Sequence, residues 1–211
     1  MTTYQSTPLF GGALVCDLPT NFADVSQLRQ VPNHQEVYID KDGFTSIIIE
    51  INERVGDEGS STEIDGRALT EHLEGIIGED VDRLKVWNTT PTQFSKLEYV
   101  ICCLEDIPAY TLIATLSPQA PPPPTEAESS SAPRPSAPDF TAIILTLVRL
   151  EQEQTDILIT VNVPHINGEY DEDDVDLELG KQGKLIGDAV DYASRIWESF
   201  TVKDWGLFKE V

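Results

Sequence analysis

Positive charge is scarce in this chain. Its 211 residues include 37 Asp and Glu but only 14 Lys and Arg, which gives a formal net charge of −23 at pH 7. Such a field repels nucleic acid and anionic membrane surfaces, and it attracts basic partners at rates that fall with added salt. We therefore expect neither a nucleic-acid ligand nor a membrane ligand. A purely solubilising role for the acidity stays open as the alternative.

Cysteine is also rare, with only Cys16, Cys102 and Cys103 in the chain. The number is odd, two of them are adjacent, and no Cys-x-x-Cys spacing occurs. This pattern argues against a disulfide framework or a zinc site and favours a reducing compartment. Each cysteine lies in an apolar run, so we expect buried, unreactive thiols.

The three histidines, His34, His72 and His165, do not have the spacing of a metal motif. His34 lies near Glu36 and could bind a metal with it, but a solvated loop histidine is the favoured interpretation. No Gly-x-Ser-x-Gly sequence is present. Gly11-Gly12 lacks the Lys-Ser/Thr of a phosphate-binding loop, so we expect a tight turn with positive φ there and no bound nucleotide. The sequence predicts neither an enzyme nor a cofactor.

Long apolar runs are missing as well. The segment from Phe140 to Leu150 stops at Arg149 and Glu151, short of the length that spans a bilayer. The first eight residues are polar and do not resemble a signal peptide. We expect a soluble, intracellular protein.

The composition nevertheless supports a folded domain, because 40% of the residues are hydrophobic. We expect one domain over residues 1–211, interrupted at 117–138 by a disordered Pro/Ser-rich insertion between two strands. This stretch contains Pro121-Pro122-Pro123-Pro124 and the serines 129–131. A plain linker is favoured over a polyproline recognition motif.

Hydrophobic periodicity predicts an antiparallel sheet of about six strands covered by helices, which is an α+β fold. The predicted strands are 13–18, 35–40, 46–55, 82–90, 96–104, 140–150 and 156–163. Residues 151–154 make the last two strands a hairpin. Apolar residues at helical spacing predict helices over 65–78 and 183–201.

One run is more specific than the rest. Residues 24–37, Asp-Val-Ser-Gln-Leu-Arg-Gln-Val-Pro-Asn-His-Gln-Glu-Val, follow Leu9-Phe10-Gly11-Gly12-Ala13. Together they resemble the N-terminal signature of the Mog family, the Ran guanine-nucleotide release factors, apart from Asn33 where the family usually has Asp. The resemblance resumes at residues 46–50 and again at 147–164, in family order.

This resemblance implies an α/β/α sandwich of the Mog/PsbP type. It also implies a protein that binds the GTPase Ran, promotes release of its nucleotide and supports nuclear protein import. Such a protein is expected in both the nucleus and the cytoplasm. We expect a monomer. The resemblance leaves open whether a further Ran-binding protein joins the complex and which nucleotide form of Ran is preferred.

The resemblance further implies Ran-binding residues. It makes Asp24, Gln35 and Glu36 part of a polar rim, and it places acidic residues with a Ran-binding role at the positions of Glu50 and Glu53. A spacing of three puts Glu50 and Glu53 on opposite faces of an ideal strand, so they share a patch only if the strand bulges or ends near Asn52.

A structural interpretation of residues 24–37 stands beside the functional one. It predicts a helical turn capped by Asp24 or Ser26, anchored by Leu28 and Val31 and ended by Pro32. In this interpretation Arg29 pairs with Asp24 or with a backbone carbonyl.

Two rival functions remain. The acidic run 169–178 could serve an acidic scaffold or chaperone for basic nuclear proteins, although a solvated loop is the favoured interpretation. The PsbP-type proteins of photosystem assembly share the predicted fold, but the lack of a transit peptide disfavours them.

Overall fold

The structure is a computed structural model that describes residues 2–28, 31–97, 107–118 and 137–209. Cys102, Cys103, Arg29 and most of the Pro/Ser-rich stretch lie outside these residues, so the expectations for them stay predictions.

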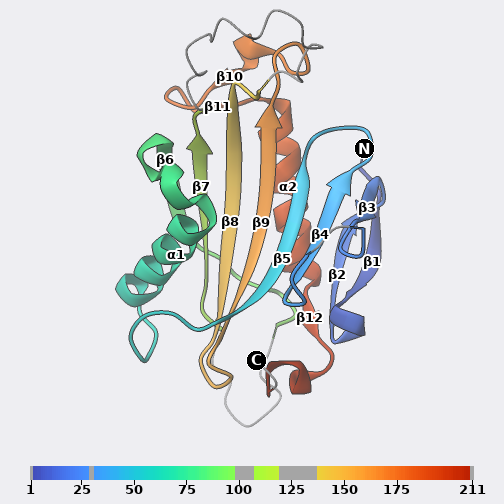
Figure 1. Cartoon of the computed structure of the whole chain (residues 1–211), viewed down its shortest axis with the longest axis vertical. Helices are drawn as coiled ribbons and strands as arrows, with labels where there is room; N and C mark the ends of the chain where they lie inside the picture. Colours follow the sequence, from blue (N-terminus) through green and yellow to red (C-terminus); the bar gives the residue numbers. More distant parts are fainter. Residues whose placement is uncertain (1, 29–30, 98–106, 119–136, 210–211) are drawn as a thin grey trace, which may run out of the picture.

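A single antiparallel sheet of seven strands forms the centre of the molecule (Figure 1). Its spatial order is β3 (Phe22–Asp24), β4 (Gln35–Asp40), β5 (Ser46–Glu53), β9 (Thr155–His165), β8 (Phe140–Leu150), β7 (Ala109–Leu116) and β6 (Leu84–Pro91). The predicted antiparallel α+β fold is confirmed, with one strand more than expected. The β8–β9 hairpin is confirmed as well, because Leu150 pairs with Thr155 across the predicted turn.

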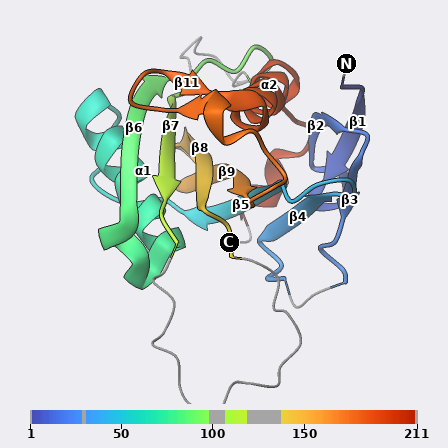
Figure 2. The same ribbon diagram turned by 90° about the horizontal axis from the view of Figure 1, so that it is seen from above.

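Helices α1 (Thr62–Ile77) and α2 (Gly183–Ser199) lie on opposite faces of this sheet. Ile47, Ile49 and Ile51 of β5 belong to the core cluster on the α2 face. Leu69 of α1 and Leu145 of β8 belong to a separate cluster on the other face. Figure 2, which looks along the sheet from above, shows the two helices apart from each other with strands between them. The layers are therefore α/β/α, as expected.

Local sequence explains the bounds of α1. The Ser61 hydroxyl accepts a hydrogen bond from the backbone N–H of Ile64 at 3.2 Å and caps the helix. Gly78 ends it with a φ of 64°, a conformation that costs glycine little. The short 3₁₀ helix η2 (Gly78–Arg83) then leads into β6.

A second sheet joins the two ends of the chain. It consists of β1 (Tyr4–Leu9), β2 (Leu14–Pro19) and β12 (Thr201–Val202), with β2 in the middle and packed on α2. The turn between β1 and β2 is the 3₁₀ segment η1 (Phe10–Gly12), in which Gly11 and Gly12 have φ values of 68° and 93°. The expected positive-φ turn is thus confirmed, whereas β1 was not predicted.

The remaining elements are short. They are η3 (Glu172–Asp174), β10 (Val175–Asp176), β11 (Lys181–Gln182) and η4 (Trp205–Lys209), and β10 pairs with β11. None of the helices in the described ranges is long and apolar enough to cross a membrane. Cys16 is buried in the core, and burial raises the pKa of its thiol to about 12.

Two sequence predictions differ from the structure. The start of the expected strand 96–104 was wrong, because Lys96 lies in a turn and Leu97 belongs to no strand, whereas 98–104 lie outside the described residues. The strand that pairs with β6 is instead β7, which begins after Pro108. Leu28, expected to anchor a helical turn, is 80% exposed. Residues 26–28 form a simple turn, held by the N–H of Leu28 donating to the Val25 carbonyl at 3.0 Å, with no helix to bury the leucine.

A carboxylate-lined groove beside helix α1

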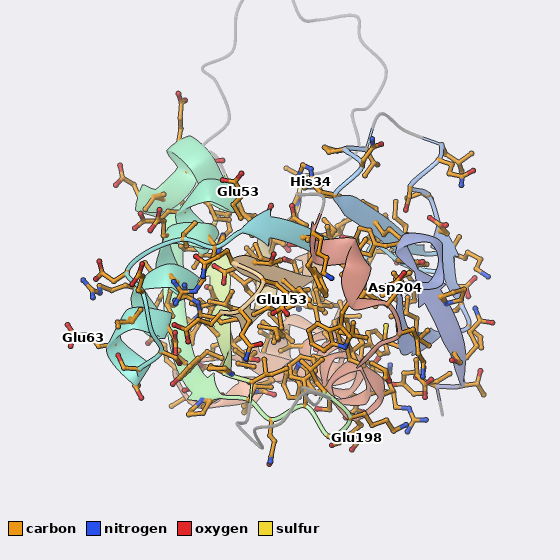
Figure 3. The ribbon with its side chains drawn as sticks, turned by 90° about the horizontal axis from the view of Figure 1, so that it is seen from below. His34, Glu53, Glu63, Glu153, Glu198 and Asp204 are labelled. Atoms are coloured by element: carbon orange, nitrogen blue, oxygen red, sulfur yellow. The ribbon has the colours of Figure 1, made fainter. Side chains whose placement is uncertain are left out.

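A groove of about 690 Å³ opens between β5 and α1. Its polar lining residues are Gln35, Glu50, Asn52, Glu53, Glu71 and His72. The groove therefore contains three of the five residues expected to bind Ran, together with Glu71 of α1. Figure 3, seen from below, shows Glu53 on the same rim of the molecule as His34, whose carbonyl accepts a hydrogen bond from the N–H of Ile51 at 2.9 Å.

The end of β5 explains how Glu50 and Glu53 can share one groove. Ile47, Ile49 and Ile51 face the α2 core, so Glu50 and Asn52 face the opposite side. Glu53 is the last residue of the strand. Glu53 lines the groove together with Glu50 and Asn52. The strand thus ends close to Asn52, which is the condition under which Glu50 and Glu53 can share a surface.

Within the groove the two glutamates differ in their surroundings. Gln35 lies opposite Glu50 in the β4–β5 register, and its amide donates a hydrogen bond to the Glu50 carboxylate. Glu50 is only 9% exposed. Glu53 and Glu71 are exposed, and in the part of the chain that the structure describes their carboxylates have no hydrogen-bond or ion-pair partner. The groove therefore has a buried, oriented carboxylate beside two free ones.

Asp24 and Glu36 do not join this groove. Glu36 follows Gln35 in β4 and so faces the other side of the sheet. One of its carboxylate oxygens accepts the N–H of Phe10 at 2.6 Å, and the other accepts the hydroxyl of Tyr38 at 3.1 Å. Asp24 lies opposite Tyr38 in the β3–β4 register, on that same side.

Asp24 organises the turn that follows it. Its carboxylate accepts the N–H of Ser26 at 2.9 Å, and the Ser26 hydroxyl accepts the N–H of Val37 at 2.9 Å. The Asp-x-Ser pattern thus fixes residues 24–26 to the start of β4. Glu36 in turn ties β4 to Phe10, at the glycine turn. These hydrogen bonds give a structural reason for the identities of Asp24, Ser26 and Glu36, which the sequence alone did not supply.

Comparison with known proteins assigns the family. Residues 7–164 match the family model described as Ran-interacting Mog1 protein. The chain belongs to this Mog1 family. The Ran guanine nucleotide release factor of Bos taurus is 30% identical over 166 residues, which cover 78% of each chain. The nuclear import protein mog1 of Schizosaccharomyces pombe is 36% identical over 81 residues, which cover 37% of this chain and 40% of that protein.

The fold agrees with this assignment. The crystal structure of the Saccharomyces cerevisiae Ran-binding protein Mog1p superposes with a TM-score of 0.66. The match has 22% sequence identity and covers 99% of this chain and 100% of Mog1p. The α/β/α arrangement around a mostly antiparallel sheet is therefore the Mog1 fold.

Below the groove of this Mog1-family chain lies a buried ionic cluster that sequence reasoning missed. Arg149 has an exposed fraction of 1%, and its guanidinium contacts Asp65 at 3.1 Å and Asp156 at 3.2 Å. Asp156 also binds Nε2 of His72 at 2.8 Å. The backbone of Val55 makes two hydrogen bonds to this cluster. Its N–H donates to the Asp156 carboxylate at 3.1 Å, and its carbonyl accepts from the Arg149 guanidinium at 2.5 Å.

This cluster fixes the walls of the groove. It connects α1, through Asp65 and His72, with the end of β8 and the start of β9, and Val55 lies just beyond Glu53. The sequence signal was Arg149 itself, a cation inside an otherwise apolar strand. Among the residues described, no group of His, Cys, Asp and Glu has the geometry of a metal site.

The contacts of Glu36 predict a pH dependence. Burial raises the pKa of its carboxyl, against the lowering effect of the hydrogen bonds from Phe10 and Tyr38. The folded state therefore holds this proton more tightly than the unfolded chain, so the stability that the protonated Glu36 contributes is complete below its ordinary pKa and is lost as the pH rises through its raised pKa in the folded state. We expect the stability of Glu36→Gln relative to wild type to increase between about pH 4 and about pH 7.

Urea unfolding across this pH range measures the difference. Exposed Glu79→Gln is the matched control, and its difference from wild type should stay flat. A flat profile for Glu36→Gln as well would contradict the prediction.

Proposed function

We propose that this chain binds the GTPase Ran, promotes release of its guanine nucleotide and thereby supports nuclear protein import. Its Mog1-family membership and the names of its relatives support this proposal. The chain acts as a regulator in the nucleus and cytoplasm, without catalytic chemistry of its own. Residues 1–211 form one such domain, with 117–138 as an insertion.

The groove beside α1 is the proposed Ran-binding site. The observation that carries this assignment is the juxtaposition of the free carboxylates of Glu53 and Glu71 with the oriented carboxylate of Glu50. Gln35 holds Glu50 in place, and Asp24 and Glu36 act from the other face by fixing β4. Carboxylates in this arrangement bind the lysine and arginine side chains with which a GTPase otherwise holds phosphate.

Linkage dictates how such binding releases nucleotide. A release factor must bind nucleotide-free Ran more tightly than loaded Ran, and nucleotide then weakens its binding by the same factor. If the groove competes for cationic groups that contact the phosphates or disturbs the magnesium site, this difference in affinity follows.

The direct test measures release of a fluorescent GTP from purified Ran. Saturating protein should raise the release rate by about tenfold. Coupling between two ligands typically changes affinity by roughly 5–150-fold, and most differences in affinity appear in the dissociation rate. A parallel pull-down with nucleotide-free, GDP-loaded and GTP-loaded Ran should retain most protein on the nucleotide-free form. Binding without any acceleration would contradict the release function and leave a Ran-binding protein only.

A further inference from the structure

The groove beside α1 has an apolar half that its carboxylates do not explain. Four aliphatic residues line it together with the acidic ones, namely Ile48, Val55, Ile76 and Leu158. We call these four residues the apolar half of the groove. A cation loses hydration when it is buried against aliphatic side chains, so a ligand that is only a cation gains nothing from them. The apolar half therefore indicates a ligand that also has an apolar part.

Ile76 is the member of the apolar half that is open to solvent. Three other apolar residues of α1, Leu69, Leu73 and Ile77, pack in the core cluster between this helix and the sheet. Ile76 is 40% exposed, and in the described part of the chain it belongs to neither core cluster. Leu158, by contrast, is 1% exposed. Ile76 is therefore the aliphatic side chain of the groove that another molecule can cover most.

Gly75, beside Ile76, provides a second and independent observation. It lines the groove within the last turn of α1, where glycine loses more backbone freedom than alanine would. A Cβ added at Gly75 would meet no atom of the described chain within 4 Å, apart from its own neighbours along the helix. Packing within the described residues thus does not require glycine at this position. A missing Cβ does let another molecule approach the helix backbone closely.

The spacing along both walls of the groove specifies the shape of the ligand. On α1, Gly75 follows Glu71 by four residues, so the two positions lie on one side of the helix about 5.4 Å apart. On β5, Ile48 and Glu50 are two residues apart and line the groove together, with a spacing of roughly 6–7 Å. Each wall therefore has an apolar position about 6 Å from a carboxylate.

We propose that the groove receives from Ran a basic side chain together with a large apolar side chain about 6 Å away, and that the apolar side chain packs against Gly75 and Ile76. Residues four apart on a helix or two apart on a strand have this separation. This inference rests on the proposed Ran-binding function of the groove. It makes Gly75 and Ile76 specificity residues, because carboxylates attract many basic surfaces whereas the apolar half selects those with an apolar neighbour.

Replacing Gly75 with alanine tests the close contact. Isothermal titration calorimetry of the full chain with nucleotide-free Ran should show an affinity at least about fivefold weaker for Gly75→Ala, because an added methyl group overpacks a tight contact. Gly66→Ala is the matched control. Gly66 also lies in α1 with open space at its Cβ position, but it does not line the groove, so affinity should change less than about twofold. Neither variant should lower the urea midpoint, since alanine favours a helix.

Replacing Ile76 with alanine tests the apolar contact. Complete burial of an isoleucine side chain changes an equilibrium by roughly 12- to 160-fold, and only 40% of Ile76 is left to cover. Ile76→Ala should therefore weaken Ran binding by about three- to eightfold. The loss should be equal at low and high salt, because salt screens charges and not apolar contacts. Val86→Ala is the control, since Val86 is 48% exposed on β6 outside the groove, and it should leave affinity unchanged.

The outcomes separate this inference from the proposed function. If wild type does not bind Ran, both are overturned. If wild type binds and Glu50→Lys/Glu53→Lys weakens the complex, but Gly75→Ala and Ile76→Ala do not, the groove stays the binding site and the inference alone is wrong. An equal loss for Gly66→Ala would attribute the effect to the helix and also overturn the inference. A loss for Ile76→Ala that disappears at high salt would mean that no apolar contact forms.

Discussion

Replacing Arg149 with methionine is expected to lower the free energy of unfolding by about 3–5 kcal/mol. Methionine fills most of the volume, but it leaves the carboxylates of Asp65 and Asp156 buried without their cation. It also removes the donor that holds the carbonyl of Val55. Breaking one side of a buried ion pair is costly because the remaining charge keeps its desolvation penalty. Urea unfolding by circular dichroism measures the loss.

Two further variants identify the cause of this loss. Arg195→Met removes a cation whose side chain is 44% exposed and pairs with Asp17, so it should cost no more than about 1 kcal/mol. Adding Asp65→Asn and Asp156→Asn to Arg149→Met removes the stranded charges and should restore part of the stability. A loss below about 1 kcal/mol for Arg149→Met would show that the cluster does not hold the fold together.

The second large effect concerns the proposed Ran-binding groove. Reversing both Glu50 and Glu53 to lysine should weaken binding to nucleotide-free Ran by about a hundredfold or more, which corresponds to at least about 2.7 kcal/mol. The variant puts positive charge where the partner presents its own, and opposed like charges cost several kcal/mol. Isothermal titration calorimetry at two salt concentrations measures both the affinity and its electrostatic part.

The control must change net charge by the same amount. Glu74→Lys/Glu79→Lys reverses two exposed glutamates that do not line the groove, and it should reduce affinity by less than about threefold through long-range repulsion. Because Glu50 is nearly buried, Glu53→Lys alone and Glu50→Gln/Glu53→Gln check that a loss does not come from a disturbed sheet. Unchanged affinity in all three groove variants, with the fold intact, would contradict the assignment.

The local sequence pattern was sufficient to predict those elements whose own residues carry a clear hydrophobic periodicity. The β8–β9 hairpin follows from two β-branched runs around a polar turn, and α2 follows from its apolar stripe. β7 was not predicted, and a strand was expected at 96–104 instead, because the pairing of β7 with β6 and β8 is set by contacts distant in sequence. The edge strand β1 was missed because it buries little of its own surface, and its residues are ordered by pairing with β2.

For the candidate site as well, some features could be predicted from the sequence and others depend on the folded structure. The resemblance to the Mog family implied roles for Glu50 and Glu53, and the two-residue period of a strand gave the condition under which they could share a surface, namely a strand end near Asn52. The two-residue period of the predicted strand already puts Gln35 and Glu36 on opposite faces, but only the register with β5 and the hydrogen bond to Phe10 show which of the two lies in the groove. Glu71 and the partners of Arg149 come from α1 and β9, so their proximity depends on the folded sheet. The Ran-binding roles of all these residues stay predictions.

The small sheet described above has a consequence for synthesis of the chain. β12 pairs with β2, so Thr201 lies opposite Val15 and Val202 opposite Leu14. These contacts join segments separated by nearly the whole chain, and such long-range pairing forms late because its loop-closure entropy is large. During translation, the apolar surface of β2 therefore stays exposed until α2 and β12 have been synthesised and can cover it. We expect ribosome-bound intermediates of this protein to be clients of chaperones until the last helix has emerged.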